Sequence, residues 1–219
     1  EGGAPEATEC KVTLQFDESM LKDVQLSSIN AEGTAIVERT SENGGTVTMP
    51  AGGRIQVSSS NYFSVTVGDT GAQPGEVTRG YGIYRCGIEG ITKDTTIELT
   101  KAAAPGVAPT EEECSVTNNQ ERGVIFISNN TDKMVYCKIM DENGNKHTDW
   151  FQIEGGKYGN ISTSRFYSGT YYVYTCFADY YDGYGEPEEN LVYKIPFTIA
   201  PPVPPTAEDV SIDTSHPGV

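Results

Sequence analysis

Short runs of alternating hydrophobic and polar residues recur along the whole chain of 219 residues. Residues 12–16 (Val-Thr-Leu-Gln-Phe) alternate as a half-buried strand should, and further β runs cover 62–67, 82–86 and 95–99. The chain has no convincing helical periodicity. The pattern therefore predicts an all-β protein.

Two Asn-Gly dipeptides, at 43–44 and 143–144, each lie between two such runs. Asn-Gly readily adopts the positive φ that a two-residue hairpin turn needs, so we expect a β-hairpin at each position. The runs that flank these turns are 34–39 and 46–49, and 134–140 and 147–153. Around seven short strands in about 95 residues are typical of an antiparallel β-sandwich.

The sequence is also duplicated. Residues 9–13 (Glu-Cys-Lys-Val-Thr) recur at 113–117 (Glu-Cys-Ser-Val-Thr), and other matches follow in the same order. These matches are 42–44 with 142–144, 52–54 with 155–157, 58–64 with 162–168, and 81–86 with 171–176. Ordered self-similarity indicates a repeat architecture, so we expect two homologous repeats.

Proline-rich joints follow each repeat. The predicted organisation is repeat one at 1–103, a linker at 104–110, repeat two at 111–200 and a C-terminal segment at 201–219. Proline spacing of this kind favours extended, semi-rigid linkers.

The C-terminal segment aligns at 208–213 with the first strand of repeat two, where Val210 takes the place of the cysteine. This alignment predicts that the first strand of a third repeat includes Val210, Ser211 and Ile212. It is either the severed start of a longer array or a strand that the chain donates to a neighbour.

The late strands of both repeats, Tyr81 to Cys86 and Tyr171 to Cys176, share the pattern Tyr-x-Ile/Val-Tyr-x-Cys. In this pattern each repeat resembles the immunoglobulin-like modules of secreted and surface proteins of prokaryotes. One departure is that the partner cysteine, Cys10 or Cys114, lies on the first strand. The resemblance implies two tandem immunoglobulin-like antiparallel β-sandwich domains, joined by a Pro-rich linker and followed by an extended C-terminal strand.

Four of the five cysteines occupy equivalent places in the two repeats. The duplication therefore predicts one disulfide in each repeat, Cys10–Cys86 and Cys114–Cys176. Disulfides persist in oxidising compartments, so we expect an extracellular or cell-surface protein. Asn129 and Asn160 begin Asn-x-Ser/Thr sequences, which accept glycans only in a host that glycosylates.

The fifth cysteine, Cys137, has Val37 as its counterpart in repeat one. One interpretation is a buried thiol in place of a core valine, because free cysteine behaves as a small hydrophobe. The alternative is a link between chains. The cysteine and histidine spacings match no zinc site.

The net charge is −16, from 31 acidic and 15 basic residues. This excess opposes nucleic-acid binding, which needs basic stripes, and no apolar stretch approaches the length of a membrane span. His147 and His216 are the only histidines, and both are expected at the surface. With no catalytic motif either, we expect no enzyme activity.

Repeat two carries a tyrosine-rich and acidic extension at 177–189. Its candidate ligand-binding residues are Tyr180, Tyr181 and Tyr184, since tyrosine offers large amphipathic contact area. The calcium candidates are Asp179, Asp182 and Glu186, although their spacing matches no defined ligand loop. The simpler alternative is tyrosines that cover a sheet edge and acids that are solvated. No other cofactor is expected.

These features favour a non-enzymatic extracellular structural protein, a subunit or segment of a surface filament, a pilus-like fibre or a tandem-repeat assembly. Its partners would be copies of itself or neighbouring repeats, and C-terminal strand donation is one route to polymerisation. The alternative is an adhesin or carbohydrate-binding module that uses the tyrosine-rich loop to bind a glycan or host-surface ligand.

Overall fold

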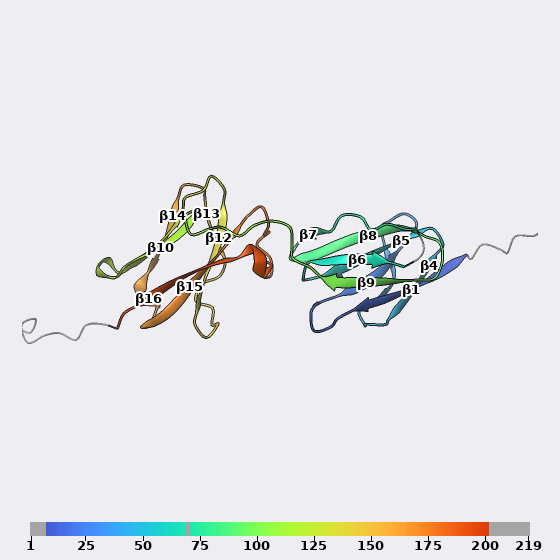
Figure 1. Cartoon of the computed structure of the whole chain (residues 1–219), viewed down its shortest axis with the longest axis horizontal. Coiled ribbons are helices and arrows are strands. Elements are labelled where there is room, and N and C mark those ends of the chain that lie inside the picture. The colour runs from blue at the N-terminus through green and yellow to red at the C-terminus, as the bar shows by residue number, and fades with distance from the viewer. Residues whose placement is uncertain (1–7, 69–70, 202–219) are drawn as a thin grey trace, which may run out of the picture.

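The computed structural model describes residues 8–68 and 71–201, and this part of the chain is all-β (Figure 1). Besides strands it contains only three short 3-10 turns, η1 (Gln120–Arg122), η2 (Thr163–Arg165) and η3 (Glu189–Leu191). We call strands β1–β9 the first half and strands β10–β16 the second half. The expected all-β class is confirmed.

The first half consists of two sheets, with strand orders β4-β1-β9-β6 and β3-β2-β5-β8-β7. Its strands are β1 (Glu9–Phe16), β2 (Gln25–Ile29), β3 (Ile36–Thr40), β4 (Thr46–Pro50), β5 (Gly53–Ser59), β6 (Phe63–Val67), β7 (Thr78–Gly80), β8 (Ile83–Ile91) and β9 (Thr95–Lys101). Every pairing is antiparallel except that of β1 with β9, which is parallel. Alternation along β1 buries Val12 and Leu14 in a core shared with Ile55 and Ile88 of the other sheet.

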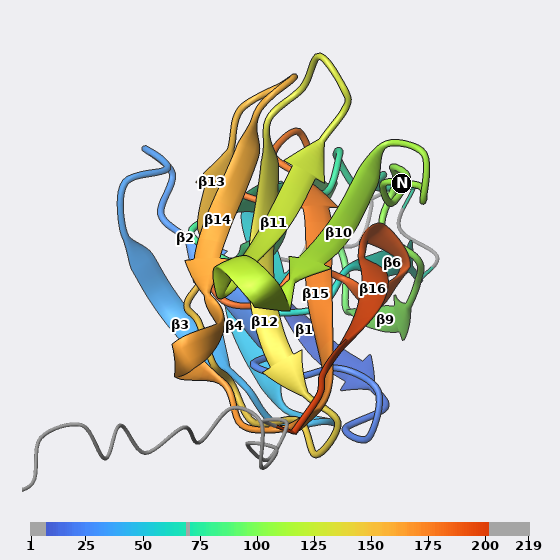
Figure 2. The same ribbon diagram turned by 90° about the vertical axis from the view of Figure 1, so that its left-hand side faces the viewer.

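The second half also has two sheets, β10-β11-β14 and β13-β12-β15-β16. Its strands are β10 (Cys114–Asn119), β11 (Val124–Asn129), β12 (Val135–Asp141), β13 (Phe151–Ile153), β14 (Tyr158–Ser162), β15 (Gly169–Phe177) and β16 (Tyr193–Ile199). Figure 2 looks onto this half and shows β14, β11 and β10 side by side. Ile125 and Ile127 of one sheet share a core with Val173 and Phe197 of the other. Two sheets around a common apolar core are consistent with a β-sandwich in each half.

The two halves differ in strand order. Strand β1 pairs with β4 and β9, whereas β10, the first strand of the second half, pairs with β11. Strands that match in sequence therefore do not have matching neighbours in their sheets.

One of the two predicted hairpins forms. Strands β12 and β13 pair antiparallel around the second Asn-Gly, with Val135 opposite Ile153. The hairpin predicted at 43–44 is wrong, because β3 pairs with β2 and β4 pairs with β1, in different sheets. This turn docks on β1 instead: the Gly44 amide donates to the Leu14 carbonyl (2.7 Å) and the Phe16 amide donates to Asn43 Oδ1 (3.0 Å).

All five cysteines are buried and unbridged. The Cys10 thiol lies 3.9 Å from the carbonyl oxygen of Ile91, at the end of β8. In the pairing of β5 with β8, Ile91 lies opposite Gly53. Cys86 lies opposite Val57, which is four positions after Gly53 along β5. Four positions span about 13 Å, whereas bridged Cα atoms lie within about 7 Å. The predicted Cys10–Cys86 disulfide is therefore not formed in the structure.

The predicted Cys114–Cys176 disulfide is not formed either. Neighbouring residues of a strand point to opposite faces of the sheet, and Thr175 of β15 points toward Cys114 in the core of the second half. Cys176 belongs instead to a separate apolar cluster with Tyr181 and Leu191. The two thiols therefore lie on opposite sides of β15.

Cys137 is fully buried in the core of the second half, as the buried-thiol interpretation predicts. Its assumed counterpart Val37 is exposed on the edge strand β3, so the comparison with a core valine is wrong. A thiol with no exposed surface cannot link two folded chains.

Candidate functional site

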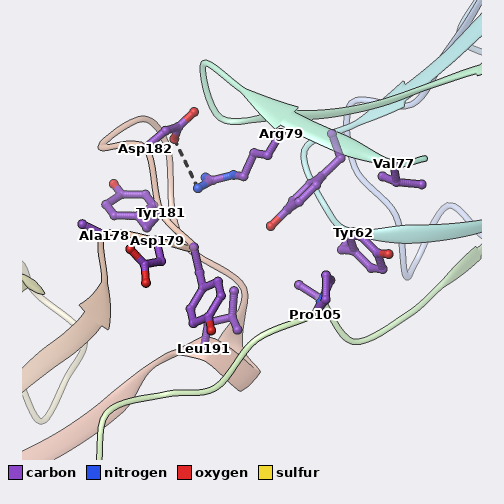
Figure 3. A pocket seen from close by; sticks show the side chains of 12 residues that line it. Tyr62, Val77, Arg79, Pro105, Ala178, Asp179, Tyr181, Asp182 and Leu191 are labelled. Carbon is purple, nitrogen blue, oxygen red and sulfur yellow. Dashed lines mark ion pairs between the residues drawn. The ribbon is translucent and has the colours of Figure 1, made fainter. Parts of the chain in front are cut away.

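The tyrosine-rich loop of the second half lies against the first half. We call residues 178–192, which join β15 to β16, the junction loop. In Figure 1 this loop meets the end of the first half where β7 lies. Polar side chains of the two halves contact one another there (Figure 3). The candidate site is therefore a joint between the two halves.

Arg79, the central residue of β7, forms the main polar contact across the junction. Its Nη1 lies 3.2 Å from Oδ1 of Asp182, an ion pair drawn as a dashed line in Figure 3. Its Nη2 donates to the carbonyl oxygens of Tyr184 (2.9 Å) and Glu186 (3.3 Å). The Arg79 side chain is only 10% exposed, so one largely buried guanidinium of the first half makes an ion pair and two hydrogen bonds with the junction loop.

Aromatic rings flank this guanidinium on two sides. The Arg79 Cζ lies 5.4 Å from the ring centroid of Tyr84 in the first half and 5.0 Å from that of Tyr181 in the second. Burial raises the pKa of Tyr84 to about 12, although the Arg79 charge acts in the opposite direction. Both rings stay neutral at physiological pH and act as cation–π partners of the arginine.

A cavity of about 230 Å³ lies beside these rings. Residues of the first half, the linker and the junction loop line it, among them Tyr62, Arg79, Tyr84, Pro105, Tyr180 and Leu191 (Figure 3). The site thus combines an apolar wall with a buried cation, at a place where the two halves meet.

A second polar contact crosses the junction through Glu188. This carboxylate is buried, accepts a hydrogen bond from the Tyr62 amide (2.6 Å) and pairs with the Lys101 ammonium. Nearby, Asn190 Nδ2 donates to the carbonyl oxygen of Ala104 in the linker (2.9 Å). Because buried charges are costly unless paired, these contacts favour one defined docking of the loop.

Close backbone approach requires glycine in the linker. A Cβ added at Gly106 would lie 2.8 Å from the Tyr180 ring, and the residue has a φ of +125°. The linker therefore packs against the junction loop at a point where a side chain would clash.

The predicted ligand-binding tyrosines have different roles. Tyr181 is 2% exposed, and its hydroxyl donates to the Gly185 carbonyl (2.7 Å). Tyr180 is half-buried against the linker. Only Tyr184 is well exposed, and its ring centroid lies 5.3 Å from that of the exposed Tyr81. The loop thus uses most of its tyrosine surface inside the protein.

Each of the three calcium candidates is paired with a different basic side chain. Asp182 pairs with Arg79, Asp179 with Lys133 (2.6 Å), and Glu186 with Lys138 (2.7 Å). Among the described residues, no group of three or more His, Cys, Asp or Glu side chains is placed to hold a metal. The structure therefore does not assemble these carboxylates into a common site.

Sequence reasoning missed Arg79 and Lys138, and it predicted no role for Glu188 at a junction. Lys138 is buried on β12, with its ammonium 4.9 Å from the ring centroid of Trp150. Glu188 does lie in the extension singled out from the sequence, but no pattern distinguishes it from its acidic neighbours. Arg79 carries no signal, because its role depends on a partner 103 positions away, at residue 182.

The other sequence-based candidates fall into three groups. Val210, Ser211 and Ile212 lie outside the described residues. The Asn129 amide is buried and donates to the carbonyl oxygens of Lys133 and Ile153, so a folded chain cannot accept a glycan there. Asn160 is exposed.

No protein-family model matches this sequence, and no curated protein is significantly similar to it. Within residues 8–68 and 71–201, no helix has the length and apolar character that crossing a membrane requires.

Proposed function

We propose that this chain is a non-enzymatic extracellular structural protein, a subunit or segment of a surface filament or tandem-repeat assembly. Its two halves would be tandem immunoglobulin-like domains, joined by the linker at 104–110. The interlocked junction around Arg79 carries this proposal. A filament segment needs a fixed angle between successive modules, and buried, paired charges resist bending at a joint more than a bare linker does.

The placement of the chain ends supports the same function. Strand β1 begins at the end of the first half that is far from the junction, and β16 finishes at the far end of the second half (Figure 1). A following module or subunit would therefore continue the line of the molecule. A head-to-tail contact of this kind does not close on itself and builds a fibre.

The sequence offers a means of head-to-tail contact. Residues 208–213 match the first strand of repeat two, but Val210 stands where that strand has Cys114. A strand donated to the next chain would be held by main-chain hydrogen bonds. We propose that this segment joins successive subunits.

Truncation tests this route. We expect the full chain to form linear assemblies, visible by negative-stain microscopy and analytical ultracentrifugation. The chain ended after Thr206 should stay monomeric, whereas a control ended after Asp213 keeps the donor segment and should assemble. Equal assembly of all three would overturn strand donation, and a full chain that remains monomeric at high concentration would overturn the filament proposal.

One observation favours the alternative of a carbohydrate-binding module. The rings of Tyr81 and Tyr184 are 77% and 54% exposed and lie together at the rim of the junction. Exposed aromatic faces of this kind can stack on sugar rings. Binding on a glycan array that is lost in Tyr184→Ala but kept in Tyr167→Ala, a change at another exposed tyrosine, would support this function.

A further inference from the structure

Two cysteines of the second half face a common core from different sheets. Cys114 begins β10 and Cys137 lies within β12, and both thiols are buried in the same apolar cluster. The site described above uses neither thiol. Sequence reasoning had paired Cys114 with a different cysteine.

Thr175 is a shared neighbour of these two cysteines. In the pairing of β12 with β15, Cys137 lies directly opposite Thr175. Residues opposite each other in an antiparallel pair have Cβ atoms about 4.5–5.5 Å apart. The Thr175 hydroxyl donates to the carbonyl oxygen of Tyr193 (3.2 Å). Thr175 also lowers the pKa of Cys114, and Cys114 raises the pKa of Cys137, so both groups lie near the Cys114 thiol. Both cysteines therefore contact the same small part of the core.

The remaining cysteines are excluded as partners by their positions. Cys176 points into the apolar cluster on the opposite side of β15, and Cys10 and Cys86 lie in the core of the first half. Among the three cysteines of the second half, Cys114 and Cys137 are thus the pair that shares one core.

We propose that Cys114 and Cys137 form a disulfide when the chain folds under oxidising conditions, and that this bond links the two sheets of the second half. The structure shows the reduced state. A disulfide such as oxidised glutathione would serve as the oxidant. One protein thiolate attacks it and releases one glutathione, and the second thiolate attacks the resulting mixed disulfide and releases another. The protein loses two electrons and two protons, and two glutathione thiols form.

Folding controls when this reaction can occur. Burial raises the pKa of Cys114 to about 11, and it raises the pKa of Cys137 further still. The attacking species is the thiolate, so the folded, reduced protein should resist oxidation at neutral pH. The bond should form while the core assembles, before both thiols are sealed from solvent.

Trypsin separates all five cysteines, which makes the test direct. Cleavage after Lys and Arg places them on the peptides 1–11, 86–93, 102–122, 134–138 and 166–194. The full chain would be unfolded, refolded with oxidised and reduced glutathione, alkylated and digested without reduction. We expect peptide 102–122 to be linked to peptide 134–138, and the linkage to disappear after reduction. A sample oxidised only after folding should lack it.

Two variants act as controls for the peptide linkages found in the wild-type chain. Cys176→Ser should keep the linkage, whereas Cys137→Ala should lose it and leave peptide 102–122 alkylated. For the refolded wild-type chain, reduction should lower the urea midpoint of the second half, because a cross-link restricts the unfolded state. Alkylation of both cysteines after oxidative refolding, or linkage of either one to another peptide, would overturn the proposal.

Discussion

Replacing Arg79 by methionine tests whether the two halves are held together as the structure indicates. Methionine keeps an unbranched apolar side chain between the rings of Tyr84 and Tyr181 but removes the guanidinium. Asp182 would retain its hydrogen bond from the Gly82 amide (3.0 Å), while the carbonyl oxygen of Tyr184 would lose its donor. The change thus removes the polar half of the contact and leaves most of the packing.

The size of the effect follows from the burial of the pair. At 3.2 Å two unit charges attract by about 5 kcal/mol when the effective dielectric constant is about 20. Desolvation of Arg79 offsets much of this attraction. Breaking a buried pair typically costs about 3–5 kcal/mol, but the Asp182 side chain is 30% exposed and would be rehydrated in part. We therefore expect Arg79→Met to lower the free energy of unfolding by about 2–3 kcal/mol.

Urea unfolding of the full chain measures this change. The only tryptophan, Trp150, reports on the junction, because its ring centroid lies 5.1 Å from that of Tyr181. With an m-value of about 2 kcal/mol per molar urea, the midpoint should fall by about 1–1.5 M. Small-angle X-ray scattering should show a broader range of overall dimensions, because the joint can then bend.

Arg54→Met is a matched control, since Arg54 forms an ion pair with Glu89 (3.4 Å) whose side chains are 50% and 73% exposed. That change should cost less than about 1 kcal/mol. If Arg79→Met is no more destabilising than Arg54→Met, and scattering is unchanged, then the Arg79 contact does not hold the joint. A double-mutant cycle with Asp182→Asn would isolate the pairwise energy.

Two further predictions concern the second half. Tyr181→Ala should destabilise the chain by about 3–5 kcal/mol in urea unfolding, whereas Tyr184→Ala should cost less than about 1 kcal/mol; equal effects would contradict their different burial. The Asn145 side-chain amide, followed by the backbone amides of the same turn, lowers the pKa of Asp141 from its usual 3.8 to about 2. Because the folded-state pKa is depressed, this contribution is present above about pH 4 and is lost as the pH falls toward 2. The urea midpoint of unfolding should therefore fall less steeply with decreasing pH in Asp141→Asn than in the wild-type chain. The same pH profile in both proteins would contradict the low pKa of Asp141.

Much of the secondary structure could be predicted from local pattern. The alternation at 12–16 became β1, and the run at 95–99 became part of β9, because side-chain period two is a property of the strand itself. The hairpin at 143–144 was also predictable. At 43–44 the same dipeptide instead connects two sheets, because its backbone groups bond to β1, a strand almost thirty residues earlier. A turn motif specifies local φ and not which strand follows it.

The cysteines show the same limit more sharply. Equivalent sequence positions suggested equivalent disulfides, but Cys176 and Thr175 are adjacent in sequence and face opposite sides of a sheet. A prediction can therefore assign a cysteine to the right strand but to the wrong face of the sheet, and it then selects the wrong partner cysteine. The identity of that core depends on how β10 and β15 pack.

The sequence by itself determined the all-β class, most strands and the acidic character, since these depend on composition and on short-range periodicity. Only the tertiary structure decided that the tyrosine-rich loop lies against the first half, that Arg79 and Asp182 meet, and that Cys114 and Cys137 share one core. These contacts join residues far apart in the chain, and their energy depends on burial, which exists only once the sheets have packed.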